Sequence, residues 1–331
     1  MSQAVGIVIP AYRPDVEVLS TYLRELDERV SPGHVRVELD APAPGVVKSL
    51  SAVADDLEAS LTVSTVDHRR GKGMAITAGF EALARRGDVS VLAFVDADGS
   101  TPASEAARVL EPVRTHETDL AVGSRRHPDA TVKAHETVGR RLLGDAFAWS
   151  ARRVLDVQLY DYQCGAKAVS IETWTGVRDH LYEAGFGWDV ELVAIAGALD
   201  RRIVEVPVEW TDRPGSTVSP LRDAIRLART LLDSRTRARR VAGRRTMLAD
   251  GYRTLRSFAR PPRTPLVDRL EGEIHSEGKE TDFEGNEDGR VGNEYERMGG
   301  EDGRVKKENG RVRNDLERVS SPVDPVDSGD R

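Results

Sequence analysis

The chain has 331 residues, of which 39% are hydrophobic, and it can bury the core of one large α/β domain or of two modest domains. Its single cysteine, Cys164, excludes internal disulfides and any cysteine-based zinc site, so a bound metal would need oxygen or histidine ligands. No stretch approaches the roughly 20 apolar residues that cross a bilayer, and the N-terminus begins at once with strand-like residues, so we expect a cytoplasmic protein.

Charge divides the chain into two parts. The formal net charge is −7, and residues 271–331 carry 18 acidic against 10 basic side chains, so the preceding part is close to neutral. From about Pro261 the sequence loses its aliphatic residues and turns to Gly, Glu, Asp, Asn and Arg. Such a segment cannot offset its ordering entropy by burial, and we therefore predict a disordered acidic tail over residues 261–331.

Short β-branched apolar runs alternate with helix-like segments over the first two thirds of the chain. The predicted strands are Val5–Ile9, Val35–Leu39, Leu61–Val66, Val89–Val95, Leu120–Val122, Gly165–Val169 and Ile203–Val208. The predicted helices are Val16–Arg29, Val46–Leu57, Gly73–Ala84, Ala103–Arg114, a segment from Gly139 to Leu155, Ile171–Leu181 and Asp189–Leu199. This alternation predicts an α/β fold with a Rossmann-like, mostly parallel sheet that helices cover on both faces.

A basic amphipathic segment follows over residues 220–260. Between Leu221 and Arg245 the apolar side chains share one helical stripe, and Arg222, Arg226 and Arg229 lie beside it. This pattern is typical of a helix that lies on an anionic membrane surface. It is equally typical of a helix that packs on the domain and leaves a solvated basic face, and the sequence leaves both interpretations open.

Polar residues that directly follow the predicted strands mark the expected site, because ligands of open α/β sheets bind beyond the carboxyl ends of the strands. The first strand ends in Pro10 and Tyr12, the second in Asp40, and the fourth in Asp96 and Asp98. Two carboxylates at i and i+2 can reach one hard cation, and a diphosphate ligand needs such a cation. The structural alternative is that Asp98 only forms a turn ahead of the next helix.

Basic residues are expected at the same edge of the sheet. His68–Gly73 is a basic, glycine-rich turn that opens a helix, and its backbone amides and helix N-terminus favour anions. Arg125 and Arg126 follow the fifth strand, and Arg140 and Arg141 open the next helix. A diphosphate ligand accounts for this convergence of cations and carboxylates, whereas an exposed cationic turn is the alternative for the first of these segments.

Seven motifs, in order, resemble those of family 2 glycosyltransferases with the GT-A fold, over roughly residues 4–219. The resemblance is greatest to the dolichyl-phosphate glucosyl- and mannosyltransferases. The motifs are Val8–Tyr12, Gly71–Ala75 with Gly79, Val95–Asp98, Gly123–Arg125, Asp161–Lys167, Trp188–Leu192, and Glu205–Trp210 followed by Arg213, Gly215 and Ser216.

The resemblance implies a GT-A domain over residues 1–219 that transfers glucose or mannose, with inversion, from a nucleotide diphosphate sugar to a polyprenyl (dolichyl) phosphate, supplying lipid-linked sugar for protein glycosylation. It also implies a divalent cation, Mg²⁺ or Mn²⁺, on Asp96 and Asp98. The implied donor-binding residues are Pro10, Tyr12, Asp40, Gly71, Lys72, Asp96 and Arg125. The implied acceptor and phosphate residues are Arg140, Arg141, Arg213 and Ser216, and the candidate catalytic residues are Asp98, Asp161, Asp189 and Arg125.

One segment departs from the family pattern, which has an Asp-Asp-Gly-Ser sequence after the second strand. Here residues 37–42 read Val-Glu-Leu-Asp-Ala-Pro. The resemblance assigns Asp40 to the base of the nucleotide, and this departure leaves open whether the donor carries uridine or guanosine.

The nature of the acceptor decides whether a base is needed. A phosphate monoester is already ionised near neutral pH, whereas a sugar hydroxyl would need a carboxylate base, for which Asp161 and Asp189 are the candidates. The nearest alternative is thus an elongating glycosyltransferase that adds a sugar to a lipid-linked saccharide.

An arginine-rich nucleic-acid-binding protein is the alternative from another class. Its stacking platforms would be few, because only 5% of the residues are aromatic, and the acidic tail would oppose a polyanion. We therefore expect no nucleic-acid partner, but an enzyme that works peripherally at the cytoplasmic face of the cell membrane.

Overall fold

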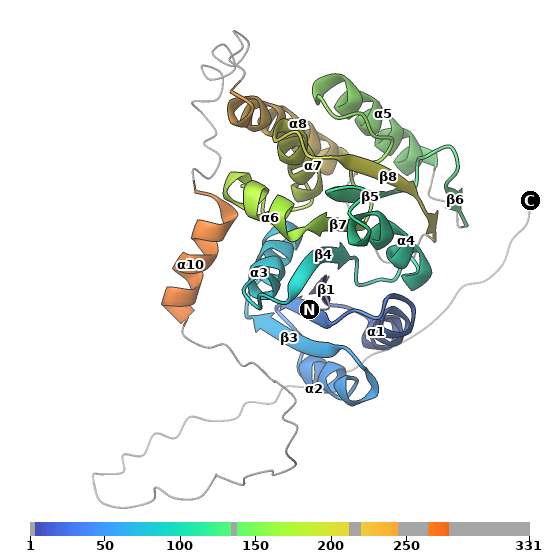
Figure 1. Ribbon diagram of the computed structural model, residues 1–331, viewed down its shortest axis with the longest axis vertical. Helices are drawn as coiled ribbons and strands as arrows, with labels where there is room; N and C mark the ends of the chain where they lie inside the picture. Colours follow the sequence, from blue (N-terminus) through green and yellow to red (C-terminus); the bar gives the residue numbers. More distant parts are fainter. Residues whose placement is uncertain (1–3, 134–137, 212–219, 244–263, 278–331) are drawn as a thin grey trace, which may run out of the picture. The chain divides into compact units, whose positions relative to one another are not determined.

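The computed structural model describes residues 4–133, 138–211, 220–243 and 264–277, without the side chains of residues 138–143, 220–225, 227 and 273–277. A seven-stranded sheet in the order β3-β2-β1-β4-β7-β5-β8 forms its centre (Figure 1). The strands are β1 Ala4–Tyr12, β2 His34–Asp40, β3 Ser60–Val66, β4 Val89–Val95, β5 Leu120–Ser124, β7 Ala166–Ser170 and β8 Ile203–Pro207. Only β7 among these runs antiparallel to its neighbours, so the predicted mostly parallel sheet is confirmed.

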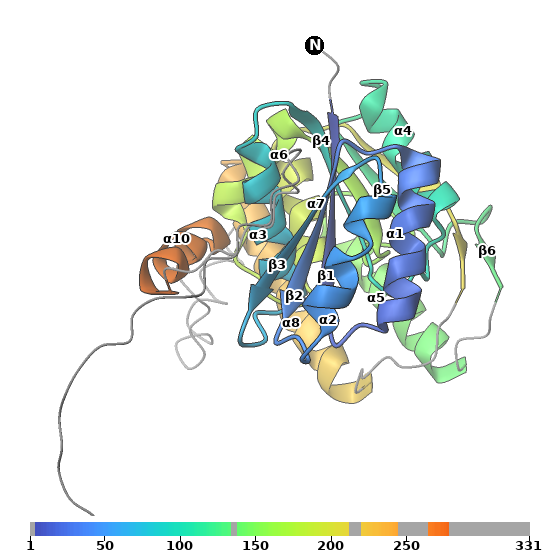
Figure 2. The same ribbon diagram turned by 90° about the horizontal axis from the view of Figure 1, so that it is seen from below.

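Helices cover both faces of this sheet, as predicted (Figure 2). The described α-helices are α1 Val16–Val30, α2 Val46–Ser51, α3 Lys72–Ala84, α4 Ala103–Arg114, α5 Val138–Val154, α6 Ile171–Val177, α7 Trp188–Ala198, α8 Pro220–Val241 and α10 Leu266–Glu277, of which α8 packs on α5 and α7 and α10 on α3. Two short 3-10 helices, Ala54–Asp56 and Arg178–His180, continue α2 and α6 where longer α-helices were predicted. A second sheet pairs β6 Thr131–Val132 with β9 Glu209–Trp210.

Two hydrophobic cores form because β1 and β4 bury apolar side chains on both faces of the sheet. One core holds apolar side chains of α1, α2 and α4, and the other those of α3, α6 and α7. Edge-to-face aromatic contacts organise the second core, with ring centroids 5.0 Å apart for Phe80 and Trp174 and 5.6 Å apart for Phe94 and Trp188. The indole N–H of Trp188 donates to the hydroxyl of Thr77 (3.1 Å), so α3 and α7 are fixed against β4.

The strand order reverses beside β1, which lies between β2 and β4. In register, Tyr12 at the end of β1 pairs with Asp40 at the end of β2. Such a reversal opens a crevice at the carboxyl ends of the strands, where ligands of doubly wound sheets bind. The topology therefore brings the ends of the first, second and fourth strands to one place.

Helix α10 corrects the prediction of disorder for residues 264–277, whereas the rest of the predicted tail lies outside the described residues. Leu266 is fully buried, and its N–H donates to the carbonyl of Leu181 (2.8 Å). The Arg269 guanidinium donates to the carbonyl of Tyr182 (2.7 Å). A short apolar stripe in α10 packs on the second core, and this burial offsets the conformational entropy that the helix loses on ordering. The stripe was not recognised because the composition of the whole tail is acidic.

Helix α8 packs on the domain and leaves basic side chains exposed, as the second interpretation of its sequence expects, and its membrane contact stays a prediction. Leu231 and Ser234 are buried where α8 packs against α5 and α7, whereas Arg226, Arg229 and Leu232 are exposed. Among the described residues, no helix has the length and apolar character needed to span a membrane.

Candidate active site

Two carboxylates follow β4 at the strand-order reversal. Asp98 is exposed on the turn, and one of its oxygens accepts a hydrogen bond from the backbone N–H of Ser100 (2.9 Å). Asp96 lies two residues earlier, and its Oδ1 is 2.8 Å from the ammonium of Lys72. Asp98 therefore does shape the turn, but this contact engages only one oxygen, and the carboxylate stays accessible beside Asp96.

Gly165 makes room for Asp96. A Cβ atom at Gly165 would lie 2.0 Å from Oδ2 of Asp96. The backbone N–H of Asp96 also donates to the carbonyl of Gly165 (2.9 Å). A glycine is therefore required here by the close approach of the carboxylate.

Lysines and aspartates alternate next to this carboxylate. The ammonium of Lys72 lies between Asp96 and Asp189, 3.4 Å from Oδ2 of the latter. The other oxygen of Asp189 accepts from Lys167 (2.8 Å), and both ammonium groups lie over the ring of Phe94, 5.0 and 5.5 Å from its centroid. Burial alone would lower the pKa of Lys72, but Asp189 and Asp96 outweigh it and raise that pKa, so the ammonium stays charged.

Sequence reasoning included Lys167 in a family motif but missed its role at the site. It lies in β7, its side chain is 1% exposed, and it also donates to the carbonyl of Cys164 (2.8 Å). The available signal was a lysine inside a short buried strand, since a lysine is almost never fully buried unless it is paired.

Asp161 is held by arginine. Its carboxylate is 2% exposed and accepts from Nε (2.7 Å) and Nη2 (3.1 Å) of Arg125 in a two-bond fork. Nη1 of Arg126 lies 3.6 Å away. Burial alone would raise the pKa of Asp161, but the two arginines outweigh it and hold that pKa well below its ordinary value. Asp161 is therefore an anion at neutral pH and a weak proton acceptor.

Asp40 holds the basic turn. Its two oxygens accept from Nε of Arg70 and from the backbone N–H of Gly71, each at 2.9 Å. Arg70 also donates to Glu38 (2.9 Å). Gly71 has a φ of 98°, and a Cβ there would lie 2.7 Å from the carbonyl oxygen of Ala184, so only glycine suits this turn. Asp40, to which the resemblance assigns the base, thus has both oxygens engaged in positioning the start of α3.

The end of β1 lies beside this turn. Tyr12 is 39% exposed, and the guanidinium carbons of Arg69 and Arg13 lie 4.4 and 5.2 Å from the centroid of its ring. Pro10 pairs in register with Glu38 and is partly buried. Stacked cations on an accessible aromatic ring form a surface suited to an anionic, planar ligand.

The residues implied for the acceptor phosphate stay a prediction. Arg140 and Arg141 fall in α5, but their side chains are not described, and Arg213 and Ser216 lie outside the described residues. Arg126 donates to Asp145 of α5 (3.1 Å). That contact ties α5 to the loop that carries Arg125.

The donor set fits a cation that a diphosphate shares with the protein. Within the described part of the chain, no three His, Cys, Asp or Glu side chains gather as a metal cage. Asp96 and Asp98 supply two carboxylates, and Mg²⁺ is commonly held by one or two carboxylates together with substrate phosphates and water. The pair therefore suits a metal that binds with its substrate.

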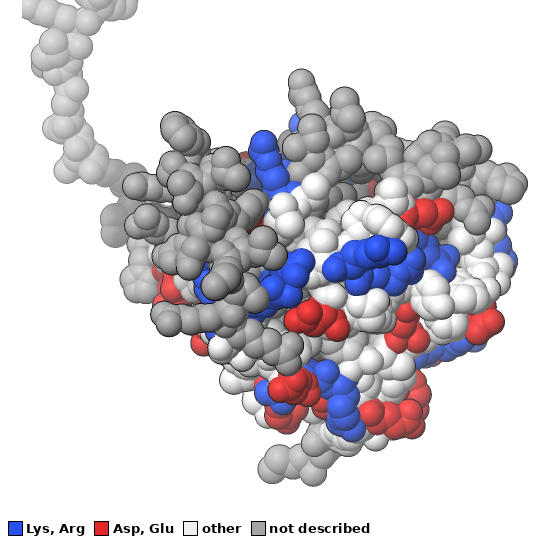
Figure 3. Space-filling view, turned by 90° about the horizontal axis from the view of Figure 1, so that it is seen from above, with Lys and Arg blue, Asp and Glu red and all other residues white. Residues whose placement is uncertain are grey.

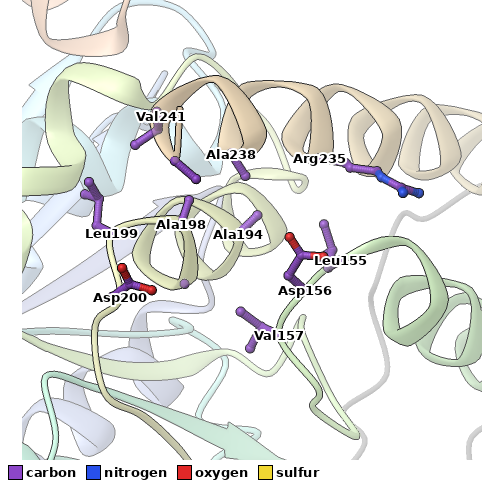
Figure 4. Close-up of a pocket in the computed structure, with 12 residues that line it drawn as sticks. Leu155, Asp156, Val157, Ala194, Ala198, Leu199, Asp200, Arg235, Ala238 and Val241 are labelled. Carbon is purple, nitrogen blue, oxygen red and sulfur yellow. The ribbon is translucent and has the colours of Figure 1, made fainter. Parts of the chain in front are cut away.

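A cavity of about 350 Å³ lies elsewhere (Figure 4). Its walls come from α7, α8 and the segment that follows α5, and they include Ala194, Ala238 and Val241. None of the predicted site residues lines it.

The chain is similar to known glycosyltransferases. No family model matches the chain. The chain is 33% identical over 166 residues to Glycosyltransferase AglD of Haloferax volcanii, a match that covers 50% of this chain and 26% of that protein. It is 32% identical over 207 residues to Undecaprenyl-phosphate mannosyltransferase of Micrococcus luteus, covering 62% of this chain and 83% of that protein.

A third relative is Dolichyl-phosphate beta-glucosyltransferase of Dictyostelium discoideum, 25% identical over 250 residues, with 70% of this chain and 74% of that protein covered. Among solved structures, glucosyl-3-phosphoglycerate synthase of M. tuberculosis has a TM-score of 0.49 and 17% identity, covering 74% of this chain and 83% of that one.

Neighbouring carboxylates at the reversal of a mostly parallel sheet, opposite a basic turn that opens a helix, define the class as a glycosyltransferase of the GT-A fold. The match to most of the mannosyltransferase of M. luteus gives the family. The chain belongs to the glycosyltransferase family that contains the polyprenyl-phosphate mannosyltransferases and dolichyl-phosphate glucosyltransferases, and the resemblance inferred from its motifs is confirmed.

Proposed function

We propose that this enzyme transfers a hexose, glucose or mannose, with inversion, from a nucleotide diphosphate sugar to a polyprenyl phosphate, and so supplies lipid-linked sugar for protein glycosylation. The observation that carries the proposal is the contact of Lys72 with Asp96 beside the exposed Asp98, at the strand-order reversal. Membership of a family whose relatives are named for polyprenyl and dolichyl phosphates supports the choice of acceptor.

On the donor side, Asp96 and Asp98 hold Mg²⁺ or Mn²⁺. When bound, the cation masks the charge of the diphosphate and stabilises the nucleotide as it leaves. Lys72 opens α3 and contacts Asp96, so in this proposal the N-terminus of α3 lies beside the diphosphate, and Asp40 fixes the preceding turn through its bond to the Gly71 N–H (2.9 Å).

On the acceptor side, the state of the two candidate bases favours a phosphate over a sugar hydroxyl. Asp161 is paired with Arg125, and Asp189 is paired with Lys167 and Lys72, so neither carboxylate is placed to accept a proton. A lipid phosphate is already nucleophilic near neutral pH and needs positioning more than a base. In this proposal Asp161 orients Arg125, and neither of the two carboxylates named for the elongating alternative is available as its base.

The test is a transfer assay with purified protein, a panel of labelled UDP- and GDP-hexoses, and polyprenyl phosphate. We expect one labelled lipid, whose sugar linkage is broken by mild acid and whose formation stops when a chelator is added. Label that appears only when a lipid-linked saccharide replaces the lipid phosphate would establish the elongating function instead.

We also propose that the exposed side of α8 contacts the membrane that holds the acceptor. Arg226 and Arg229 are exposed, and so is Leu232. Figure 3 shows the face on the side of α5 and α8, where basic side chains lie among uncharged and acidic ones. Each such cation contributes about 1 kcal/mol at an anionic membrane surface.

Charge reversal tests this contact. The double variant Arg226→Glu with Arg229→Glu should bind phosphatidylserine vesicles at least about tenfold more weakly, because two attractions become repulsions. Its activity on a short, soluble acceptor phosphate should be unchanged. The matched control is Arg29→Glu with Arg114→Glu, which reverses two exposed charges on α1 and α4. Equal vesicle binding by both double variants would refute the membrane role of α8.

A further inference from the structure

Lys72 holds a place that a metal ion would share. Its ammonium contacts Oδ1 of Asp96 (2.8 Å), one of the two carboxylates assigned to the cation, while the side chain is only 10% exposed. A buried ammonium next to a cation site lowers the affinity of that site for a second cation, because like charges repel strongly where water is scarce. One of the two proposed metal ligands, Asp96, is thus already paired with the ammonium of Lys72.

Lys167, and not Lys72, is the main partner of Asp189. It is more deeply buried than Lys72, it is closer to Asp189 (2.8 Å against 3.4 Å), and it is also bonded to the carbonyl of Cys164. The charge of Asp189 is therefore neutralised mainly by the buried ammonium of Lys167. Lys72 has the weaker hold on Asp189, and its shorter contact is with Asp96 (2.8 Å).

From this row of charges we propose that Lys72 couples the binding of the divalent cation to the binding of the nucleotide donor. Without a donor, Lys72 neutralises Asp96, and the two carboxylates Asp96 and Asp98 bind a metal weakly. A diphosphate offers Lys72 another anion and gives the metal further oxygen ligands. Metal and nucleoside diphosphate therefore bind cooperatively, and Lys167 is a positioning residue that keeps Asp189 from competing for Lys72. This inference rests on the proposed use of a nucleotide sugar.

Calorimetry on the full chain tests the coupling directly. Mn²⁺ is titrated alone, UDP and GDP are each titrated alone, and each nucleotide is titrated at saturating Mn²⁺. In the unaltered protein we expect Mn²⁺ to tighten the binding of one nucleotide at least about tenfold, within the range found for coupled sites. Nucleotide binding without any such tightening would overturn the inference and leave the proposed function intact, whereas binding of neither nucleotide would overturn both.

Variants then identify the residue responsible. Lys72→Met keeps the aliphatic stem and removes the charge, so Mn²⁺ alone should bind roughly tenfold more tightly while the coupling falls toward onefold. Lys167→Met should act in the same direction, because Asp189 then draws Lys72 away from Asp96. Lys48→Met, which removes an exposed charge from α2, is the matched control. Coupling in Lys72→Met equal to that of the control would refute the role of Lys72, and thermal unfolding of each variant checks its fold.

Discussion

Asp161 and Asp189 are two buried aspartates of the site, and different cations neutralise them. Asp161 receives two bonds from the planar fork of Arg125, at 2.7 and 3.1 Å. Asp189 receives single bonds from two lysines, Lys167 at 2.8 Å and Lys72 at 3.4 Å. An arginine fork fixes both the distance and the orientation of a carboxylate, whereas an ammonium is a point charge that can change partners. We infer that the Asp161 pair is a rigid support and that the Asp189 row can rearrange.

The largest expected effect on activity concerns Asp98, which belongs neither to the Asp161–Arg125 pair nor to the lysine contacts of Asp189. Asp98→Asn keeps the hydrogen bond to Ser100 but removes the charge that would hold the cation. The turnover rate should fall by about 1,000-fold, because metal-assisted departure of the nucleotide contributes several kcal/mol. Thermal unfolding should not change, since Asp98 is exposed. Wild-type turnover by this variant, or by the native enzyme in excess chelator, would contradict the metal assignment.

If the pair of Asp161 and Arg125 is a rigid support, it should contribute to the free energy of unfolding. Asp161→Asn removes the buried charge that pairs with Arg125, and removing one member of such a pair costs about 3–5 kcal/mol of unfolding free energy. Asp145→Asn is the control, because it removes a half-exposed partner of Arg126, where about 0–1 kcal/mol is expected. Urea denaturation at pH 7 measures both. A loss for Asp161→Asn no greater than that of the control would show that the fork is not a support.

The same variant has a pH signature. The folded pKa of Asp161 lies below its ordinary value, so its ionised form stabilises the native state above the unfolded pKa of about 4 and loses this contribution as the pH falls below it. The difference in unfolding free energy between the wild type and Asp161→Asn should therefore stay constant from about pH 8 to pH 5 and shrink below about pH 4. A difference that shrinks on the alkaline side would reverse the sign of this argument.

The contact between Lys72 and Asp96 can be disturbed without replacing a charged residue. Gly165→Ala places a Cβ 2.0 Å from Oδ2 of Asp96, so that carboxylate must move away from its contact with Lys72. Donor KM should rise about tenfold, since a displacement near 1 Å at a site commonly costs one to two orders of magnitude. Gly176→Ala, whose Cβ would meet only side-chain atoms at 3.1 Å or more, is the control. An unchanged KM would mean that the position of Asp96 does not matter for the donor.

How far the sequence predicted this molecule depended on the distance between interacting residues. β4 and α4 begin and end where predicted, at Val89–Val95 and Ala103–Arg114, because their apolar periodicity is a local signal. The turn containing Asp96 and Asp98 was found for the same reason. The role of Lys167 was missed because its partner Asp189 lies 22 residues further on, and no local pattern records that contact.

For some residues that the sequence did identify, it did not predict the hydrogen-bond partners. Asp40 was correctly placed at a strand end, but its bonds to the Arg70–Gly71 turn span about 30 residues and were not foreseen. Helix α10 was hidden because composition was averaged over a long acidic segment, whereas its docking depends on a few apolar side chains such as Leu266. Tertiary contacts decided each of these outcomes.

The smallest expected effect tests the fork itself. Arg125→Lys keeps the positive charge beside Asp161 and removes the second parallel bond, so the unfolding free energy should fall by only about 1 kcal/mol, the size of one hydrogen bond. If the fork also orients Arg125 toward the acceptor phosphate, activity should fall through acceptor KM while donor KM stays constant. Steady-state kinetics with each substrate varied in turn separates the two constants. An equal rise in both would place Arg125 on the donor side, and no change in stability or in either constant would show that a point charge serves at Asp161 as well as a fork.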